Sequence, residues 1–320
     1  MNRYMIDDSY LENKVVVYFF RLLSKMAWFI IYRNKSSPKL NGFNENELYM
    51  ALSDVTGLDA VSESKALSQW IKIETEIKHK IMKVGPHDFL QWECIRETMG
   101  EENSLFLYSE YNFVRKSKYW KIVKDKITYP VVGEPLPFLG NVRFTGATIH
   151  HLFCLFRYLD SFSLDFDKLD YIFEFGGGYG NMCKILNSMG FKGKYYIFDL
   201  PTMNAMQRYY LHSHEIYNVE FINSHAEWNI ILNELSQKSN NMLIATWSIS
   251  ECPLKDRIVT LEKINNFNNF IIGYQEYFGE VNNVEFFDEI KEKQNDVQWR
   301  ESDMPLLPRH RLLVGRREYE

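Results

Sequence analysis

The sequence predicts an α/β protein: a doubly wound, seven-stranded, mostly parallel sheet preceded by a helical N-terminal domain. From Asp170 onward, short apolar runs alternate with helix-like stretches, which is typical of a parallel sheet with helices on both faces. A glycine-rich segment directly follows the first of these runs. Before residue 140, apolar residues recur at helical spacing instead. We therefore expect a helical domain for capping or oligomerisation over residues 1–140 and a sheet domain over 141–320.

The composition fits a packed globular protein and argues against nucleic acid as a partner. The 320 residues include 37 Lys and Arg against 42 Asp and Glu, a net charge of −5, whereas nucleic-acid binding needs a basic surface. Cys94, Cys154, Cys183 and Cys252 form no C-x-x-C pair and have no zinc spacing, which indicates a reducing compartment. The polar N-terminus is unlike a signal peptide, so we expect a cytoplasmic location.

Four helices are expected in the first 100 residues. The apolar stretch over 15–31 resembles a membrane helix, but it has 17 residues and contains Arg21, Ser24 and Lys25, whereas a spanning helix needs about 20 apolar residues. A core helix is the preferred interpretation, and an interfacial helix at the inner face of the membrane is the alternative. Aromatic residues of this region, where exposed, would fit a homodimer. The expected helices cover 11–32, 45–56, 62–83 and 87–98.

A connector rich in proline and glycine precedes the sheet domain. Residues 129–146 contain three Pro and three Gly, which indicates a linker or an ordered active-site loop. A helix is expected next, over 147–162. Upstream of the connector, six basic residues lie between Arg115 and Lys126. They could hold a phosphate, an anionic glycan or a membrane surface, although a solvated helix face is the simpler interpretation.

Seven strands are expected in the C-terminal domain. Five apolar runs form the parallel part, and a final pair joined by a turn with Pro305 and Pro308 forms an antiparallel hairpin at the sheet edge. The strands are expected at 171–175, 194–200, 219–222, 242–247 and 269–274, with the hairpin at 297–302 and 310–317. The helices between and after them are expected at 181–189, 204–212, 229–237, 255–265 and 284–293.

The segment from Glu174 to Gly180 is the strongest functional signal. It directly follows the first parallel strand, and Gly176, Gly178 and Gly180 let the backbone turn tightly and approach a ligand closely. A helix is expected from Asn181, so its free N–H groups face the same point. The dinucleotide fingerprint G-x-G-x-x-G would need glycine at 181, and no Walker loop is present. The loop therefore predicts a nucleoside-containing cofactor without matching either phosphate motif.

A second acid follows the next strand at a suitable distance. Asp199 lies 23 residues after Gly176, where doubly wound folds place an acid that binds the ribose hydroxyls. Pro201 then ends the strand. Glu174 is expected to point into the same cleft, where an anion would repel a pyrophosphate and suit an ammonium or sulfonium group. The charge pattern favours S-adenosylmethionine over NAD.

These segments resemble class I S-adenosylmethionine-dependent methyltransferases, and more narrowly the bacterial sugar O-methyltransferase family. The segments that carry the likeness are EFGGGYG (174–180), FDLP (198–201) and TWSISECP (246–253), with looser matches over 273–283 and 310–315. The likeness covers about 145–320 and implies cofactor roles for the acid and glycines of the loop and ribose binding by Asp199. Further cofactor contacts are expected from Leu200, Ser224 and Trp247. Cys252 stands where the family often has methionine.

The methyl acceptor is expected at the carboxyl ends of the strands, where doubly wound sheets bind their ligands. Transfer to a hydroxyl requires a base for its proton. Glu251 is the first choice for this base, with an ion pair to Arg257 as the structural alternative. His225 is the second choice, with a surface histidine as its alternative. The residues expected to contact the acceptor are Tyr274, Gln275 and His150. His151 is on the same helix as His150 but faces another side. His310 is expected to be structural.

The predicted function is transfer of a methyl group to a sugar hydroxyl of a bacterial surface polysaccharide or its precursor. The sugar part is implied by the resemblance alone. No adjacent pair of acids marks a strand end, so no metal is expected. Two alternatives stay open: an NAD(P)-dependent oxidoreductase, which the glycine spacing disfavours, and a non-catalytic scaffold with a methyltransferase fold. The expected partners are a small-molecule or glycan acceptor, a second copy and a peripheral membrane contact.

Overall fold

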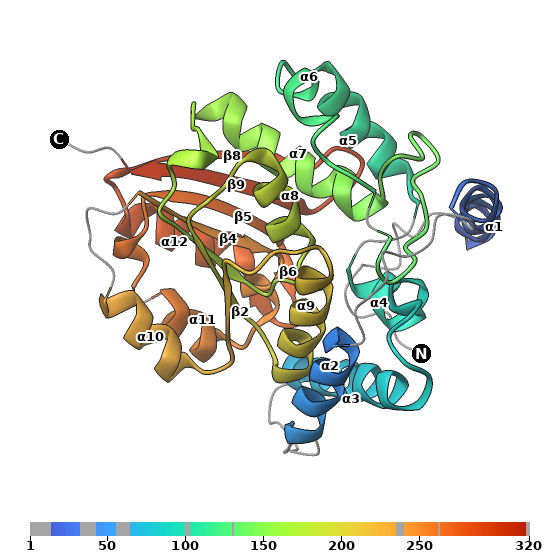
Figure 1. The fold of residues 1–320 in the computed structure, drawn as a ribbon. Helices are drawn as coiled ribbons and strands as arrows, with labels where there is room; N and C mark the ends of the chain where they lie inside the picture. Colours follow the sequence, from blue (N-terminus) through green and yellow to red (C-terminus); the bar gives the residue numbers. More distant parts are fainter. Residues whose placement is uncertain are drawn as a thin grey trace.

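The computed structural model describes residues 14–32, 43–55, 65–99, 103–129, 131–234, 240–261 and 263–317. Its centre is a seven-stranded sheet in the order β3-β2-β1-β4-β5-β9-β8 (Figure 1). Strands β1 to β5 run parallel to one another, and β9 is antiparallel to both of its neighbours, β5 and β8. The predicted fold class is therefore confirmed. The strands are β1 Tyr171–Phe175, β2 Lys194–Phe198, β3 Val219–Ile222, β4 Asn241–Thr246, β5 Asn269–Gln275, β8 Val297–Asp303 and β9 His310–Arg317.

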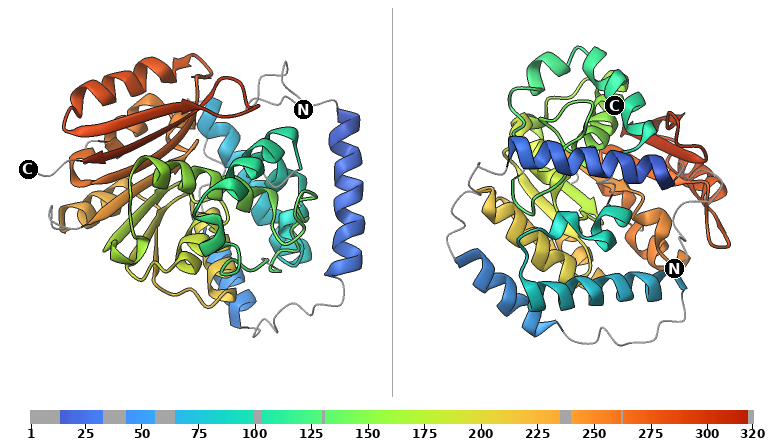
Figure 2. Two further views of the ribbon diagram at one scale, coloured as in Figure 1. Left: turned by 90° about the horizontal axis from the view of Figure 1, so that it is seen from above. Right: turned by 90° about the vertical axis from the view of Figure 1, so that its right-hand side faces the viewer.

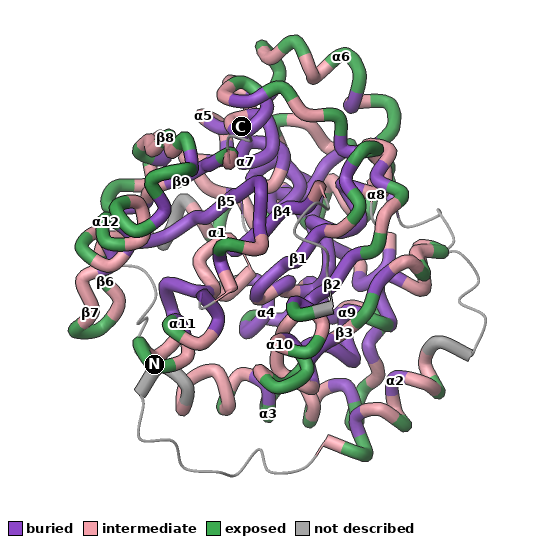
Figure 3. The backbone as a smooth tube through the Cα atoms, turned by 90° about the vertical axis from the view of Figure 1, so that its left-hand side faces the viewer, coloured by how far each residue is buried: buried purple, intermediate pink, exposed green. Residues whose placement is uncertain are grey.

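Alternate side chains of each strand face two different layers of helices. Ile172 of β1 belongs to a core shared with α7, α8 and α9, whereas the next residue, Phe173, belongs to a core shared with α10, α11 and α12. Because both faces are covered, β1, β2, β4, β5 and β9 are buried along most of their length, whereas the edge strand β8 is largely not (Figure 3). The first layer consists of α7 Gly146–Ser161, α8 Asn181–Met189 and α9 Pro201–Ser213, and the second of α10 His225–Glu234, α11 Leu254–Leu261 and α12 Asn283–Lys293.

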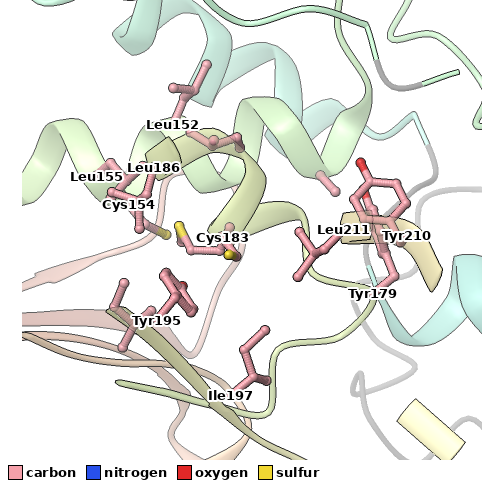
Figure 4. Packing of buried hydrophobic residues seen from close by; sticks show 14 of the residues in the cluster. Leu152, Cys154, Leu155, Tyr179, Cys183, Leu186, Tyr195, Ile197, Tyr210 and Leu211 are labelled. Carbon is pink, nitrogen blue, oxygen red and sulfur yellow. The ribbon is translucent and has the colours of Figure 1, made fainter. Parts of the chain in front are cut away.

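The first core extends from the sheet to the glycine-rich turn. Cys154 of α7 and Cys183 of α8 point toward each other beside Tyr195 of β2 (Figure 4). All four cysteines are free thiols. At the other end of the same core, Tyr179 packs edge-on against Tyr210 of α9, with ring centroids 5.0 Å apart. The turn after β1 is therefore held against α9 by aromatic packing.

The helices of the N-terminal region pack directly on the sheet-covering helices. α2 (Phe43–Asp54) and α3 (Lys65–Val84) contact α9, and α5 (Leu105–Lys116) contacts α7. Their buried side chains belong to the same core as those of α7 to α9. α1 (Lys14–Ile31) lies along one side of the molecule (Figure 2). None of the helices in the described ranges is long and apolar enough to cross a membrane.

Some expected element boundaries differ from the structure for local reasons. The helix expected over 87–98 is split into the 3₁₀ helix Phe89–Gln91 and α4 (Glu93–Thr98), because Trp92 between them is extended. α9 begins at Pro201 rather than at 204, since proline at a helix start lacks only an N–H that would be free anyway. The basic stretch is not one helix face: α5 ends at Lys116, and α6 is only Trp120–Val123. A short hairpin, β6 (Tyr277–Phe278) with β7 (Val281–Asn282), was not expected.

A buried carboxylate joins the N-terminal helices to the sheet domain. Glu74 of α3 is almost fully buried, and its Oε1 accepts a hydrogen bond of 2.6 Å from the backbone N–H of Thr202 in the first turn of α9. Burial raises the pKa of Glu74 above its ordinary value, although the bond from Thr202 opposes the rise. An acceptor at this place satisfies an N–H that the helix itself leaves free.

We expect Glu74→Ala to lower the free energy of unfolding by about 1–3 kcal/mol, because the Thr202 N–H loses its acceptor while it stays buried. Glu74→Gln keeps an acceptor oxygen and should cost less. Urea unfolding followed by circular dichroism measures both effects. Glu76→Ala, on the same helix but half exposed, is the matched control and should change the free energy by less than ~0.5 kcal/mol. Equal losses for Glu74→Ala and Glu76→Ala would contradict this role.

Candidate active site

The turn from β1 into α8 has the geometry that its glycines predicted. Gly176, Gly178 and Gly180 all have positive φ, at 73°, 56° and 96°, in the left-handed region that other residues seldom adopt. A side chain at 176 would also overlap Ser248, which follows β4 by two residues. Gly180 caps the N-terminus of α8. The free N–H groups of this helix therefore lie beside a backbone that a ligand can approach closely.

Asp199 lies next to this turn, as its spacing predicted. Its Oδ2 accepts a hydrogen bond of 2.7 Å from Gln207 Nε2, and the same nitrogen donates to the Gly178 carbonyl at 2.9 Å. Its Oδ1 accepts from the backbone N–H of Leu200 at 2.8 Å. Burial raises the pKa of Asp199 to about 7, although these hydrogen bonds act to lower it. Gln207, which the sequence analysis missed, thus links the acid after β2 to the glycine turn.

Glu174 is placed under the glycine turn rather than in an open cleft. It is nearly inaccessible to solvent, and its Oε2 accepts a hydrogen bond of 2.9 Å from Tyr195 Oη. Burial raises the pKa of Glu174 to about 8, and the nearby Asp199 adds to the rise. Without a ligand, burial therefore disfavours the anion that was expected at this position, because an unpaired buried charge is costly.

The segment after β4 rests on the glycine turn and presents Trp247. Trp247 has a φ of 67°, which is unusual for a bulky residue. Its ring centroid lies 4.7 Å from that of His150 on α7 and 6.1 Å from that of His310 on β9. The next residue, Ser248, donates a hydrogen bond from Oγ to the Phe175 carbonyl. Strained backbone of this kind clusters at functional sites, and here it places an indole ring between two histidines.

Glu251 is buried at the end of the 3₁₀ helix Ile249–Glu251. Its nearest polar neighbour is Gln275 at the end of β5, whose Nε2 lies 3.4 Å from Glu251 Oε1. Arg257 makes no ion pair with it within 4 Å; this guanidinium donates instead to Asn283 and to the carbonyls of Ser250 and Cys252. Burial raises the pKa of Glu251 to about 8, opposed by Gln275 and by the charge of Arg257.

The residues expected after β3 are committed to local contacts. Ser224 Oγ accepts the Glu227 N–H at 3.2 Å and so caps α10. The His225 ring lies 5.0 Å from that of Phe198, and its Nε2 is 3.4 Å from Thr260 Oγ1 on α11. His225 therefore faces the helices of the second layer and has no contact with Glu251 in the structure.

Tyr274 is in the protein core, not at the acceptor side. Its ring lies 4.5 Å from that of Phe287 on α12, and its hydroxyl bonds to Glu301 on β8. The expectation that it contacts the acceptor is corrected, because this position of β5 faces the second helix layer. Gln275, one residue later, faces Glu251 and Ser250 Oγ, the latter at 3.0 Å.

His150 is part of a buried pair that the sequence analysis missed. Its Nδ1 lies 2.8 Å from Glu110 Oε1 on α5. Burial opposes protonation, but the Glu110 carboxylate outweighs it and holds the pKa of His150 well above its ordinary value. His151 faces a different neighbour: its Nδ1 is 3.0 Å from Asn181 Nδ2, and burial together with the charge of His150 lowers its pKa to about 3. The two histidines do take different faces of α7.

His310 is a second feature that the sequence analysis did not assign to the site. It is paired with Gln275 across β5 and β9, at the carboxyl edge of the parallel strands. Its Nδ1 lies 2.9 Å from the Pro308 carbonyl, so Nδ1 carries the proton and Nε2 has a free lone pair. Burial lowers its pKa. Within the described ranges, no three His, Cys, Asp or Glu side chains form a group that could hold a metal ion.

Comparisons with known proteins return methyltransferases among solved structures. No protein-family profile matches the chain, and no curated protein matches it. An rRNA methylase from Streptococcus thermophilus is 14% identical over 48% of this chain and 89% of that chain, with a TM-score of 0.37. A SAM-dependent methyltransferase from Aquifex aeolicus is 14% identical over 47% of this chain and 84% of that chain, with a TM-score of 0.35. The bifunctional kinase-methyltransferase WbdD is 15% identical over 51% of this chain and 38% of that chain, with a TM-score of 0.39.

We expect the stability of the protein to fall as the pH rises from about 5 to 8, in part because of Glu174. The unfolded chain releases this proton near pH 4.5, whereas the folded protein keeps it to about pH 8. One group that titrates in this way lowers the free energy of unfolding by up to ~1.4 kcal/mol per pH unit. The Glu174→Gln variant has no titratable group at this position, so the slope of its free energy of unfolding against pH should be flatter. Urea unfolding at several pH values measures this slope.

The matched control for this measurement is Glu289→Gln, since Glu289 is largely exposed and pairs only with Lys293 one turn away. Its slope should equal that of the wild type. A Glu174→Gln variant with the wild-type slope would show that Glu174 is not held protonated.

Proposed function

We propose that this protein transfers the methyl group of S-adenosylmethionine to a hydroxyl group of a sugar acceptor. The observation that carries the cofactor assignment is the link between Asp199, Gln207 and Gly178. It fixes a carboxylate beside a glycine turn and a helix N-terminus, at the carboxyl edge of a doubly wound sheet. Doubly wound folds bind a nucleoside with this arrangement. The acid accepts hydrogen bonds from the ribose hydroxyls, and the turn lets the ligand approach the backbone closely.

The unsatisfied polar atoms of this site fit S-adenosylmethionine. Gln207 Oε1 and Asn181 Oδ1 are buried acceptors with no hydrogen-bond partner in the described structure. Both residues adjoin the glycine turn, where Glu174 and Asp199 add further acceptor oxygens. Orphaned buried acceptors are costly, so a ligand rich in donors would be favoured. The ammonium group and ribose hydroxyls of the cofactor are such donors.

The same atoms disfavour a dinucleotide. A pyrophosphate brings acceptors and negative charge, and it would meet two carboxyl groups and two orphaned acceptor oxygens. Each carboxyl group that stays ionised would repel it. An NAD(P)-dependent oxidoreductase is therefore the weaker interpretation of this site.

The residues after β4 and β5 supply the groups that hydroxyl methylation needs. When bound, the cofactor provides a methyl group activated by a sulfonium. Glu251, once ionised, takes the proton of the acceptor hydroxyl. Because burial raises its pKa to about 8, the fraction that can act as a base grows as the pH rises toward 8. Gln275 holds the Glu251 carboxylate through its Nε2. Trp247, which is partly exposed and follows the same strand, supplies an indole ring that can stack on the apolar side of a pyranose ring.

The sugar acceptor is supported by the resemblance of the sequence to sugar O-methyltransferases and by the charge of the chain. The net charge of −5 makes RNA an unfavourable acceptor, since RNA binding relies on a basic surface. The expected setting is the synthesis of a bacterial surface polysaccharide in the cytoplasm.

We expect the wild-type protein to bind S-adenosylhomocysteine and Asp199→Ala to bind it at least about 10-fold more weakly, because the ribose hydroxyls lose a charged acceptor. Isothermal titration calorimetry measures both, with NADH as the ligand control. Asp303→Ala is the matched control, because Asp303 is exposed at the end of β8. Wild-type binding of NADH but not of S-adenosylhomocysteine would favour the oxidoreductase. Binding of neither would favour a non-catalytic scaffold.

We expect Glu251→Gln to lower kcat by about 100-fold or more while its affinity for S-adenosylhomocysteine stays unchanged, because the amide cannot accept the hydroxyl proton. The assay is transfer of a radiolabelled methyl group to a panel of nucleotide sugars and oligosaccharides, with ribosomal RNA and bulk protein as competing acceptors. Glu289→Gln is the surface control. Labelling of RNA or protein alone would contradict the sugar acceptor, and full turnover by Glu251→Gln would exclude this carboxylate as the base.

A further inference from the structure

The outward face of α1 is mostly apolar from Tyr18 to Ile30. Met26 is 61% exposed and Ile30 77% exposed, and Tyr18, Phe19 and Phe29 are each more than half exposed. Lys25 is the one charged residue among the exposed positions of 18–31. A contiguous apolar surface of this size on a folded protein marks a contact with another molecule. We propose that α1 is the surface through which two copies of this chain associate.

The inward face of α1 fixes the helix to the rest of the molecule. Ser24 is fully buried, and its Oγ accepts a hydrogen bond of 2.8 Å from Asn103 Nδ2. Phe20 packs on Tyr108 of α5, with ring centroids 5.9 Å apart. At the C-terminal end, Tyr32 donates from Oη to the Val142 carbonyl at 2.6 Å. The apolar face is therefore presented on an anchored helix, not on a loose segment.

The spacing of the exposed residues is that of a helix-pairing seam. Phe19, Leu22, Met26 and Phe29 follow one another at intervals of three, four and three residues. This is the a/d pattern by which two helices pack side by side. Lys25 lies at the flank of the seam, where its long side chain can reach water. A seam of this kind fits a second copy of itself, since a twofold axis pairs the same helix from each chain.

The area of the apolar face around the seam is near what a stable dimer needs. Six large apolar side chains are exposed on the face that contains the seam: Tyr18, Phe19, Leu22, Met26, Phe29 and Ile30. Fully exposed side chains of this type offer roughly 200 Å² each, so at their observed exposures they present on the order of 700 Å². A standard specific interface buries ~800 Å² per partner. The views in Figure 2 place α1 at the outside of the molecule, where a second copy can reach it along its length.

Charge disfavours a lipid surface as the occupant. Electrostatic membrane binding uses clusters of about four to eight basic residues, whereas the exposed face of α1 offers only Lys25. The basic stretch that begins at Arg115 lies instead at the end of α5, on α6 and in the turns beside α6. An interfacial helix also needs a charged face toward water, and the face of α1 opposite the stripe is packed on protein through Phe20 and Ser24.

The test is the mass of the full chain in solution by size-exclusion chromatography with light scattering. The wild type should have about twice the monomer mass of 38.2 kDa. The double variant Phe19→Glu/Met26→Glu should weaken the dimer on the order of 100-fold and run as a monomer, because it buries charges in the seam. Met50→Glu is the matched control: Met50 of α2 is 70% exposed but lies outside the seam, and this variant should stay dimeric.

A second measurement keeps the proposal testable if the double variant does not fold, as circular dichroism would reveal. Met26→Cys should form a disulfide-linked dimer on mild oxidation, and Met50→Cys should not. A wild-type chain that stays monomeric up to about 100 μM, or a double variant that stays dimeric, would overturn the proposal. A monomer that floats with vesicles of phosphatidylglycerol and phosphatidylcholine would assign α1 to a membrane instead. None of these outcomes depends on the cofactor, so they are independent of the proposed function.

Discussion

The close packing of the β4 loop on the turn from β1 into α8 is the constraint on which the site depends. Three residues of this turn have left-handed φ values, and Ser248 occupies the space that a side chain at 176 would need. The bond from Ser248 to the Phe175 carbonyl joins the ends of the two strands. Trp247 and Glu251, on either side of Ser248, are consequently held beside the glycine turn. Replacing the glycine would separate the glycine turn from Trp247 and Glu251.

A second property of the site is that its carboxyl groups are buried without ion pairs among the described residues. Glu174, Asp199 and Glu251 all have raised pKa values, and in each case burial is the main cause. Their bonds to Tyr195 and Gln207 offset only part of that cost. A ligand that brings an ammonium group would favour ionisation of the nearest acid, so its binding would release a proton. These partly unsatisfied groups therefore favour a cationic ligand that carries hydrogen-bond donors.

The sequence predicts the parts of this protein that depend on local patterns. Strand alternation, the positive φ of the loop glycines and the place of Asp199 follow from neighbours along the chain, and the structure has all three. It does not predict which face of β5 a residue takes, because the run is apolar on both sides; hence Tyr274 was expected at the site and lies in the core. The pairing of Glu110 with His150 joins residues 40 apart on two helices, and no local signal indicates it.

The N-terminal helices support the site as well as covering the sheet. Glu74 of α3 holds the first turn of α9 through Thr202, and α9 carries Gln207, which in turn holds Asp199. A displacement of α3 would therefore move the acid that we assign to the ribose. Because buried side chains of α2, α3 and α5 share one continuous core with α7 to α9, the N-terminal helices cannot shift without disturbing the packing behind the glycine turn. The N-terminal helices thus support the proposed active site, in addition to the proposed association through α1.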